Sequence, residues 1–308
     1  MESEFVRWLR TRLPSSPLLR VGPGDDAAVL QASDAADEQV VTCDLLCDGV
    51  HFRVGTDNAR RIGRKALAVN LSDLSAMAAT PVAGFFAVAL PRDRSVCAEE
   101  LYEGILPLAE EFSLAIAGGD TNVWDGPLVI SITLIGRCAG GASLLRSGAR
   151  PGDHLLVTGQ FGGSLLGHQF DFQPRIREAL WLCEHYSLHA GIDCSDGLLL
   201  DASRMAEESG CGVVIDLQSV PIAEAAVMMA KRQGDTNSAL EHALADGEDF
   251  ELLLAVPQKD AQKIIQSQPL DVSLRCIGTF IDQPGLWQAT DAAPIPLEPR
   301  GFLHGGSL

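Results

Sequence analysis

The chain has 308 residues, of which 46% are hydrophobic and 21% are charged, a composition typical of a globular protein large enough for two domains. Its formal net charge of −18 argues against nucleic acid and anionic membranes as partners, because both are bound through basic surfaces. An anionic small substrate stays possible, because bound divalent cations invert the local field.

The eight cysteines form neither a C-x-x-C pair nor a cysteine–histidine zinc spacing. Scattered cysteines in a chain of enzyme size predict reduced thiols. The first residues lack the basic and then apolar profile of a signal peptide, and no apolar run reaches the roughly 18 residues that span a bilayer. We therefore expect a cytoplasmic protein.

The apolar spacing of the first half predicts helices that alternate with strands. Glycine and proline then crowd residues 139–153, where we expect a boundary between a first domain over 1–138 and a second over 139–308. The expected helices of the first half cover residues 4–13, 58–79 and 97–112, and its strands cover 39–46, 81–90, 114–117 and 128–137. The strand over 81–90 is apolar throughout, which predicts that it is buried.

The same alternation begins again in the second half. Its expected strands cover residues 154–158, 191–194, 212–217, 250–256 and 274–280, and its helices cover 173–185, 197–209 and 259–266. The sequence therefore predicts an α/β (α+β) fold in both halves.

Aspartates recur close to the predicted strands. The sequence Asp-Cys-Ser-Asp-Gly (193–197) follows one strand and Gly-Gly-Asp-Thr (118–121) follows another, with similar layouts at 24–26 and 42–44. Because ligands bind at the carboxyl ends of strands in open α/β sheets, we expect these carboxylates to converge. Two such charges about 4 Å apart repel by roughly 4 kcal/mol at an effective dielectric near 20, so they need a cation. Oxygen-only ligands suit Mg²⁺ or Ca²⁺.

Each motif also has a simpler interpretation. Asp196 or Ser195 could serve only as an N-cap of the following helix, worth about 1 kcal/mol. Asp73 shares a face with Asn70 on a helix that is apolar nearly all round, and its alternative is a salt bridge with Lys65 or an arginine. Turns would explain residues 24–26 and 247–249, and Arg146 and His51 could be merely solvated or structural. The joint occurrence of the aspartates favours a metal site.

Several phosphate and hydrolase motifs are absent from the sequence. It contains no G-x-x-x-x-G-K-[ST] loop, no kinase-type glycine loop, no G-x-S-x-G and no H-E-x-x-H. A phosphate enzyme with this sequence must therefore rely on metal ions and glycine-rich backbone.

Taken together and in order, seven motifs resemble those of the thiamine-monophosphate kinase family. They are GDDAAVL (24–30), TCDLLCDGVHF (42–52), KALAVNLSDLSAMAA (65–79), AGGDT (117–121), RSGARPGD (146–153), IDCSDGLLLD (192–201) and GEDFELL (247–253). The resemblance implies the two-domain aminoimidazole-ribonucleotide-synthetase-like fold, in which an N-terminal sheet domain binds ATP and Mg²⁺ and forms the core of a homodimer. A C-terminal α/β domain would complete the active site.

The resemblance also implies the reaction and its residues. Several Mg²⁺ ions and ATP would bind in a cleft, and the γ-phosphate would pass in line to thiamine monophosphate, giving thiamine diphosphate. Asp44, Asp120 and Arg146 would be catalytic. The implied metal ligands are Asp26, Thr42, Asp44, Asp73, Asp120, Asp193 and Asp196; the implied ATP contacts are Gly119, Asp120, Arg146 and Ser195; the implied thiamine contacts are His51, Glu248 and Phe302.

The sequence departs from the family at Cys43, where a hydroxyl residue is usual, and over 168–177, which is shorter and keeps only residues 173–175 of an Arg/Pro motif. Two alternatives stay open. One is a sister ATP-dependent synthetase of the same superfamily with another acceptor. The other is a non-catalytic nucleotide or thiamine-phosphate binding protein, against which the intact set of aspartates argues.

Overall fold

The computed structural model describes residues 8, 10–13, 16, 18–22, 24–30, 38–93, 95–138 and 143–303 of the chain. Most of the helix expected over 4–13 lies outside a continuous described stretch, but residues 8 and 10–12 are helical. Within the described part of the chain, no helix is long and apolar enough to cross a membrane.

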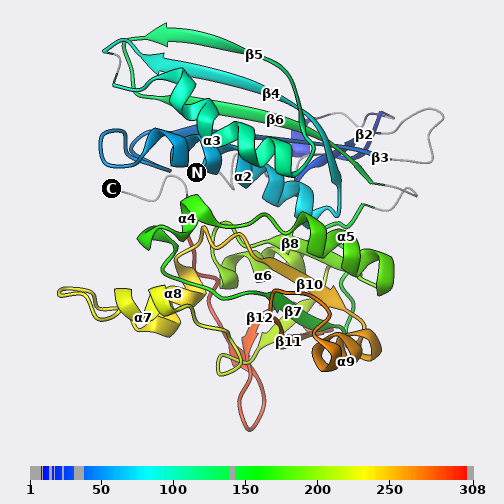
Figure 1. Ribbon diagram of the computed structural model, residues 1–308. Coiled ribbons are helices and arrows are strands. Elements are labelled where there is room, and N and C mark those ends of the chain that lie inside the picture. The colour runs from blue at the N-terminus through cyan, green and yellow to red at the C-terminus, as the bar shows by residue number, and fades with distance from the viewer. Residues whose placement is uncertain are drawn as a thin grey trace.

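The first half forms a six-stranded sheet in the order β1-β2-β3-β6-β4-β5. Two helices, α2 and α3, lie on the side of this sheet that faces the second half, and none of the described helices covers the other side (Figure 1). The strands are β1 (Leu19–Val21), β2 (Ala28–Leu30), β3 (Glu38–Cys47), β4 (Thr80–Pro91), β5 (Ala115–Trp124) and β6 (Val129–Cys138), and the helices are α2 (Ala59–Ala76) and α3 (Ala98–Glu111).

Burial along β4 alternates, because the sheet is covered on one face. Phe86 and Val88 are buried, whereas Phe85 and Ala87, which alternate with them, are exposed. The prediction that this strand is buried is therefore wrong for every second residue. A continuous apolar run identifies a strand but does not tell whether both of its faces meet a core.

The second half forms a seven-stranded sheet in the order β13-β12-β9-β11-β7-β10-β8, with its helices around it (Figure 1). Its strands are β7 (His154–Thr158), β8 (Ala190–Asp193), β9 (Gly212–Ile215), β10 (Leu252–Val256), β11 (Leu274–Ile281), β12 (Gly285–Gln288) and β13 (Ile295–Pro296). Its helices are η2 (Ser164–Leu166, a 3₁₀ turn), α4 (His168–Asp171), α5 (Ile176–His185), α6 (Leu198–Glu208), α7 (Glu224–Met229), α8 (Ala239–Ala245) and α9 (Gln258–Ser267).

The two sheets confirm the mixed α/β fold but correct its expected strand directions. Among the described strands only β4–β5 and β9–β12 pair in parallel, and the other pairs are antiparallel. Asp193 does end β8, but Asp44 lies inside β3 and Asp120 inside β5. The placement of all the aspartates at carboxyl strand ends is therefore wrong, because an apolar pattern fixes neither the direction nor the partner of a strand.

Helix α2 runs between the two halves. It packs against β3, β4 and β6 on one side and against α4, α5 and β8 on the other. Most of its residues are buried, as the apolar sequence predicts. Several of its polar side chains, among them Lys65, Ser72 and Asp73, contact residues outside the helix.

Candidate active site

Three aspartates from distant parts of the chain meet beside α2. Asp26 lies in the loop between β1 and β2, Asp73 lies in α2, and Asp193 ends β8. One carboxylate oxygen of each lies within 4.8 Å of those of the other two. The structure thus brings three of the predicted metal ligands together, and they come from both halves of the chain.

Strand β3 brings Thr42 and Asp44 to the same place. The Thr42 hydroxyl donates a hydrogen bond to the Asp73 carboxylate, and the backbone N–H of Asp44 donates to Asn70 Oδ1 at 3.2 Å. Burial raises the pKa of Asp44 to about 6; a hydrogen bond with Asp73 opposes this rise, and the charge of Asp26 adds to it. Asp44 therefore borders the three aspartates.

Part of the hydrogen-bonding capacity of these buried carboxylates is unused within the described residues. Oδ1 of Asp193 and Oδ2 of Asp26 are buried and have no hydrogen-bond partner among the described residues. Burial, followed by the charges of Asp44, Asp193 and Asp26, raises the pKa of Asp73 well above its ordinary value. Burial and then the charge of Asp26 do the same to the pKa of Asp193. Carboxylate and hydroxyl oxygens are the ligands of hard divalent cations, so these residues fit Mg²⁺.

The structural alternative for Asp73 is wrong. Lys65, its suggested partner, instead forms an ion pair with Glu248 at 2.6 Å. Among the described residues, no lysine or arginine forms a salt bridge with Asp73. The helix therefore presents a carboxylate to the cluster without a cation of its own.

Arg146 lies at the edge of the cluster. Its Nη2 donates to Asp26 Oδ1 at 2.5 Å, and its backbone N–H donates to both carboxylate oxygens of Asp25, at 3.3 and 3.2 Å. Its Nε is buried without a hydrogen-bond partner among the described residues. The free N–H of Arg146 could bind a phosphate oxygen, and the free oxygens of Asp26 and Asp193 could bind a divalent cation. Together they suit a phosphate ligand that is bound with divalent cations.

The loop between β8 and α6 carries Ser195 and Asp196, and neither side chain caps α6. The N-cap is Gly197, and the Asp201 carboxylate accepts the backbone N–H of Asp196 at 2.9 Å and of Gly197 at 3.1 Å. The capping interpretation is therefore wrong. Arg204 donates to Asp196 Oδ2 at 2.5 Å, so this aspartate has a cation and is not among the three grouped aspartates.

Two of the residues expected to contact the acceptor join this same loop. The backbone N–H of Glu248 donates to the Ser195 carbonyl at 2.7 Å, and that of Phe302 donates to the Asp196 carbonyl at 2.8 Å. Glu248 has a φ of 55°, a left-handed conformation that costs a non-glycine residue on the order of 1 kcal/mol. The residues assigned to ATP and to the acceptor are thus adjacent, and the backbone at Glu248 is held by its surroundings.

His51, the third expected acceptor contact, lies in the loop after β3. The backbone N–H of Cys47 donates to His51 Nδ1 at 3.0 Å, so the neutral imidazole carries its proton on Nε2. The His51 carbonyl accepts a hydrogen bond from Lys65 Nζ at 2.7 Å. His51 and Glu248 therefore lie on either side of one lysine.

Gly119 and Asp120, like Asp196, are predicted residues outside the three grouped aspartates, and they lie on a separate strand. Both are exposed on β5, where Asp120 lies beside Ala87 of β4. The sheet order places β6 and β4 between β3 and β5. Three strand spacings correspond to roughly 14 Å between Asp44 and Asp120. The role of Asp120 as a metal ligand stays a prediction.

Sequence analysis missed several polar residues that organise the site. Lys65 pairs with Glu248, and Ser72 donates to Asp193 Oδ2 at 2.5 Å. Asp201 and Arg204 hold the loop at Asp196. Lys65 could have been found, because a lone lysine inside a buried apolar helix requires a partner. Ser72 and Asp201 carry no comparable pattern.

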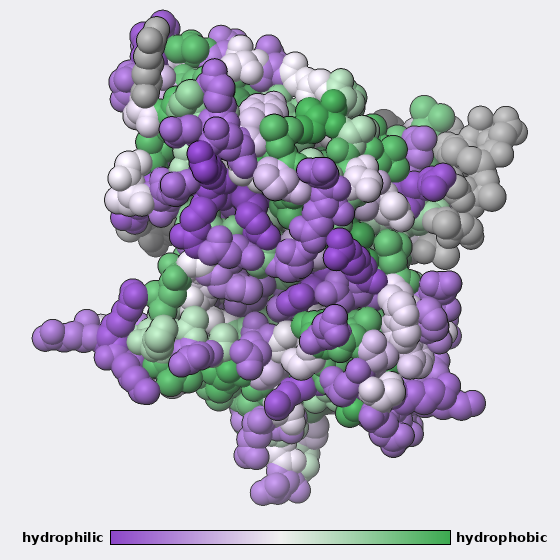
Figure 2. Space-filling model, in the orientation of Figure 1, coloured by the Kyte–Doolittle hydropathy of each residue, from purple (hydrophilic) through white to green (hydrophobic). Residues whose placement is uncertain are grey.

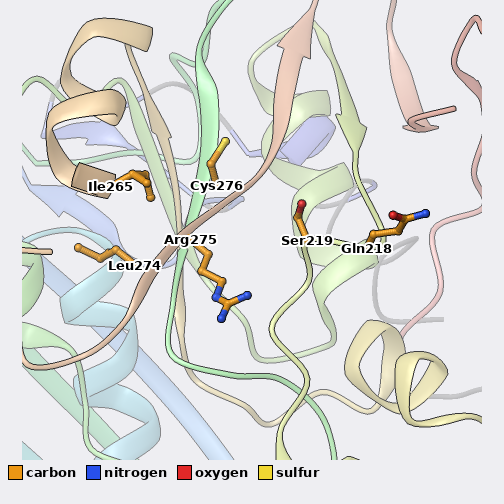
Figure 3. A pocket seen from close by; sticks show the side chains of 6 residues that line it. All are labelled: Gln218, Ser219, Ile265, Leu274, Arg275 and Cys276. Carbon is orange, nitrogen blue, oxygen red and sulfur yellow. The ribbon is translucent and has the colours of Figure 1, made fainter. Parts of the chain in front are cut away.

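The cluster lies at the junction of the two halves, because Asp73 is on α2 and Asp193 ends β8, which packs against that helix. Figure 2 shows that hydrophilic residues also gather across the middle of one face of the molecule. A separate surface hollow of about 340 Å³ lies on the second half, between β11, α9 and the loop after β9 (Figure 3). None of the predicted site residues lines it. Its lining is Gln218, Ser219, Ile265, Leu274, Arg275 and Cys276.

Comparison with known families agrees with this geometry. Residues 24–138 match the N-terminal domain and residues 128–286 the C-terminal domain of the AIR synthase related proteins. The thiamine-monophosphate kinase of Rhodopirellula baltica is 42% identical over 99% of this chain and 98% of its own length. That of Escherichia coli K12 is 32% identical over 95% of this chain and 94% of its own length.

Solved structures give the same picture. AaThiL complexed with AMPPCP and TMP has a TM-score of 0.80 at 25% identity, over 97% of this chain and 94% of that one. The thiamine-monophosphate kinase of Stenotrophomonas maltophilia K279a has a TM-score of 0.73 at 33% identity, over 94% of this chain and 96% of that one. The hydrogenase maturation protein HypE of E. coli, at 19% identity and a TM-score of 0.70 over 98% and 99% of the two chains, shares the fold. The chain therefore belongs to the thiamine-monophosphate kinase family and is a kinase.

Proposed function

We propose that this protein transfers the γ-phosphate of ATP to thiamine monophosphate, forming thiamine diphosphate in the cytoplasm. The observation that carries the proposal is the group of Asp26, Asp73 and Asp193, in which one oxygen of Asp26 and one of Asp193 are buried without a partner among the described residues, as is the Nε of the neighbouring Arg146. Membership of the family supports the choice of substrates, since the relative AaThiL was solved with AMPPCP and TMP.

The residues at the junction have distinct tasks in this reaction. Bound Mg²⁺ would supply the positive charge that offsets the phosphate oxygens. Arg146 would bind phosphate oxygens alongside them, with Ser195 and Gly119 as further ATP contacts. His51, Glu248 and Phe302 would orient the acceptor. The ligands proposed for Mg²⁺ are Asp26, Thr42, Asp44, Asp73, Asp120, Asp193 and Asp196.

The chemistry requires positioning more than proton transfer. The attacking group is a phosphate oxygen with a second pKa near 6, so it is mostly ionised at pH 7 and needs no general base. The barrier is the approach of two polyanions, which the Arg146 guanidinium and the carboxylate-held cations would offset. We therefore propose a single in-line displacement with both substrates bound.

A second copy of the chain is part of the proposal. The uncovered face of the first sheet exposes large apolar residues, among them Leu45 at 57% and Phe85 at 45%. All ten residues of the edge strand β5 are exposed. Exposed edges and apolar faces of this kind are covered in stable proteins. We propose that the sheets of two subunits cover each other.

The homodimer would also explain the isolation of Asp120. Within one chain this residue is exposed and lies three strands away from Asp44. We propose that Asp120 of the partner subunit completes each metal site. Each active site would then contain residues of both subunits.

The reaction is tested by measuring phosphate transfer from ATP to thiamine, thiamine monophosphate and aminoimidazole ribonucleotide precursors. Transfer to thiamine monophosphate alone is expected, with inversion at a chiral γ-phosphate and no radiolabel left on the protein when acceptor is omitted. Retention of configuration would refute in-line transfer, and a preference for another acceptor would favour a sister synthetase.

The shared site is tested by mixing two inactive variants, Asp44→Asn and Asp120→Asn, after reversible dissociation. If each site combines Asp44 of one subunit with Asp120 of the other, one site of each mixed dimer is intact. About a quarter of the wild-type activity should return, because half of the dimers are mixed. No recovery, with mixed dimers demonstrated by native mass spectrometry, would place both residues in the same subunit.

A further inference from the structure

Lys65 of α2 is completely buried although it carries an ammonium group. Such a group has three N–H donors, and here each has a partner. Nζ lies 2.7 Å from the His51 carbonyl, 2.6 Å from Glu248 Oε1 and 2.5 Å from Gln169 Oε1. The ring of Phe170 adds a cation–π contact at 5.3 Å. The hydrogen-bonding capacity of Lys65 is therefore used up within the protein.

The partners of Lys65 belong to three separate segments. His51 lies in the loop after β3, Gln169 lies in α4, and Glu248 lies in the loop before β10. Two of these residues are the proposed acceptor contacts. The ammonium group consequently fixes the spacing between a first-half loop and a second-half loop that would enclose the acceptor.

A direct role in binding phosphate does not fit this geometry. A lysine that binds ATP phosphates needs both an exposed Nζ and an unused N–H. Lys65 has an exposure of 0%, and its three donors are engaged. Glu248, in contrast, keeps 23% of its side chain exposed, so a bound acceptor can reach it.

We propose that Lys65 is a positioning residue of the acceptor site, which sets the affinity for thiamine monophosphate by holding His51 and Glu248 in place without touching either substrate. This inference rests on the proposed function, because it takes His51 and Glu248 as acceptor contacts. It assigns a role to a buried residue that contacts both of them.

The surroundings show why Glu248 needs such support. Its backbone adopts a φ of 55°, and its N–H is tied to Ser195. Burial lowers the pKa of Lys65, and the neighbouring Glu248 carboxylate opposes that shift. Without Lys65, the Glu248 carboxylate would lose this ion pair. A movement of Glu248 towards solvent would then hydrate its charge and relax its left-handed backbone.

The test is Lys65→Met, which keeps most of the unbranched side chain and removes its charge. The KM for thiamine monophosphate should rise by roughly tenfold or more, as expected for loss of a charge-assisted contact. The KM for ATP should stay within about twofold of wild type. An equal rise in both KM values, or a fall in kcat with the acceptor KM unchanged, would overturn the proposal.

Arg64→Met is the matched control on the same helix. Arg64 donates to the Phe170 carbonyl at 2.8 Å and to the Phe172 carbonyl at 2.7 Å, so it also holds the α4 segment. Among the described contacts it forms no hydrogen bond or ion pair with His51, Gln169 or Glu248, and it shares with Lys65 only Phe170, through the backbone carbonyl rather than the ring. Its loss should lower the melting temperature but leave the ratio of the two KM values unchanged. A shift in that ratio like that of Lys65→Met would mean that any loosening of α4 suffices.

A double-mutant cycle keeps the proposal testable if Lys65→Met is unstable. In a Glu248→Gln background, Lys65→Met should raise the acceptor KM much less than in wild type, because the residue through which it acts is already altered. Gln169→Leu, which removes one of the three hydrogen bonds of Lys65, should give a smaller rise in the same acceptor KM. Fully additive effects, or no change with Gln169→Leu, would refute positioning. Failure of the wild-type protein to phosphorylate thiamine monophosphate would refute the proposed function instead.

Discussion

Two buried carboxylates on neighbouring strands have opposite surroundings. Asp193 ends β8 and is paired in register with Leu252 of β10, the residue that follows Glu251. Glu251 accepts hydrogen bonds from the Thr158 hydroxyl at 2.5 Å and from Arg175 at 2.8 and 2.5 Å. Asp193 accepts one from Ser72, and its other oxygen has no partner in the described part of the chain.

The difference separates a structural carboxylate from a functional one. Both side chains are almost fully buried, at 3% for Glu251 and 1% for Asp193. Burial of a charge is tolerated when a cation and hydrogen bonds satisfy it, as Arg175 does for Glu251. Asp193 instead adds its charge to those of Asp26 and Asp73. Arg146 pairs with Asp26, and among the described residues no lysine or arginine pairs with Asp73 or Asp193, so the proposed divalent cation would balance the remaining charge.

The strongest test of this contrast is Asp73→Asn. It removes one charge from the unpaired group without changing its shape, so kcat should fall by roughly a thousandfold or more, about 4 kcal/mol. The metal-free variant should at the same time be at least as stable as wild type, because it relieves repulsion. Steady-state kinetics and thermal unfolding in EDTA measure the two effects. Near-normal activity would mean that the cluster is not the metal site.

Arg175→Met tests the paired carboxylate. Removing the cation leaves Glu251 buried with its charge unbalanced, so unfolding free energy should fall by about 3 kcal/mol. The variant should keep its kcat at temperatures where it is folded, because nothing in this pair faces the cluster. Urea unfolding and activity on the same samples make the comparison. A large loss of kcat without a loss of stability would place Arg175 among the phosphate contacts.

The metal-free protein should also show the contrast in its pH dependence. Burial is the first cause that raises the pKa values of Asp25 and Asp44 to about 6, from ordinary values of 3.8. A folded state that binds protons more tightly than the unfolded state is stabilised at low pH. Stability should therefore fall as pH rises from about 4 through about 6, by on the order of 1 kcal/mol.

Saturating Mg²⁺ should reverse this trend, because the cation binds the deprotonated carboxylates. Asp201 contributes in the same direction, since burial and the charge of Asp196 raise its pKa to about 7. The relevant quantity is thus the difference between wild type and Asp44→Asn, whose slope should be shallower. Identical slopes in the two proteins, with and without Mg²⁺, would show that the cluster does not control the titration.

Apolar periodicity was enough to locate the helices and strands that build the core, such as α2 and β6, because each is long and strongly patterned. Strand direction was not predictable from the apolar pattern. β3 is central and antiparallel to its neighbours, whereas β5 lies at an edge and pairs in parallel. Short elements such as α4 and β13 were missed, because two to four residues carry no periodicity.

The sequence motifs were enough to predict the aspartates that form the cluster, but not the contacts around them. Asp26, Asp73 and Asp193 were identified from the sequence and lie together in the structure. The contacts that arrange them were not, because the hydrogen bond from Ser72 to Asp193 joins residues 121 positions apart. The proposed role of Asp120 depends on how two subunits associate, and the apolar pattern of a single sequence does not predict that.

Because α2 packs against both halves, the contacts that hold the halves together also arrange residues of the candidate site. This helix contributes Asp73 to the cation cluster, Ser72 to Asp193 and Lys65 to Glu248, so three sets of contacts cross from it to partners outside the helix. Any hinge opening that separated the halves would withdraw Asp193 and Glu248 together. The proposed metal and acceptor sites therefore depend on the same packing of α2 between the two halves.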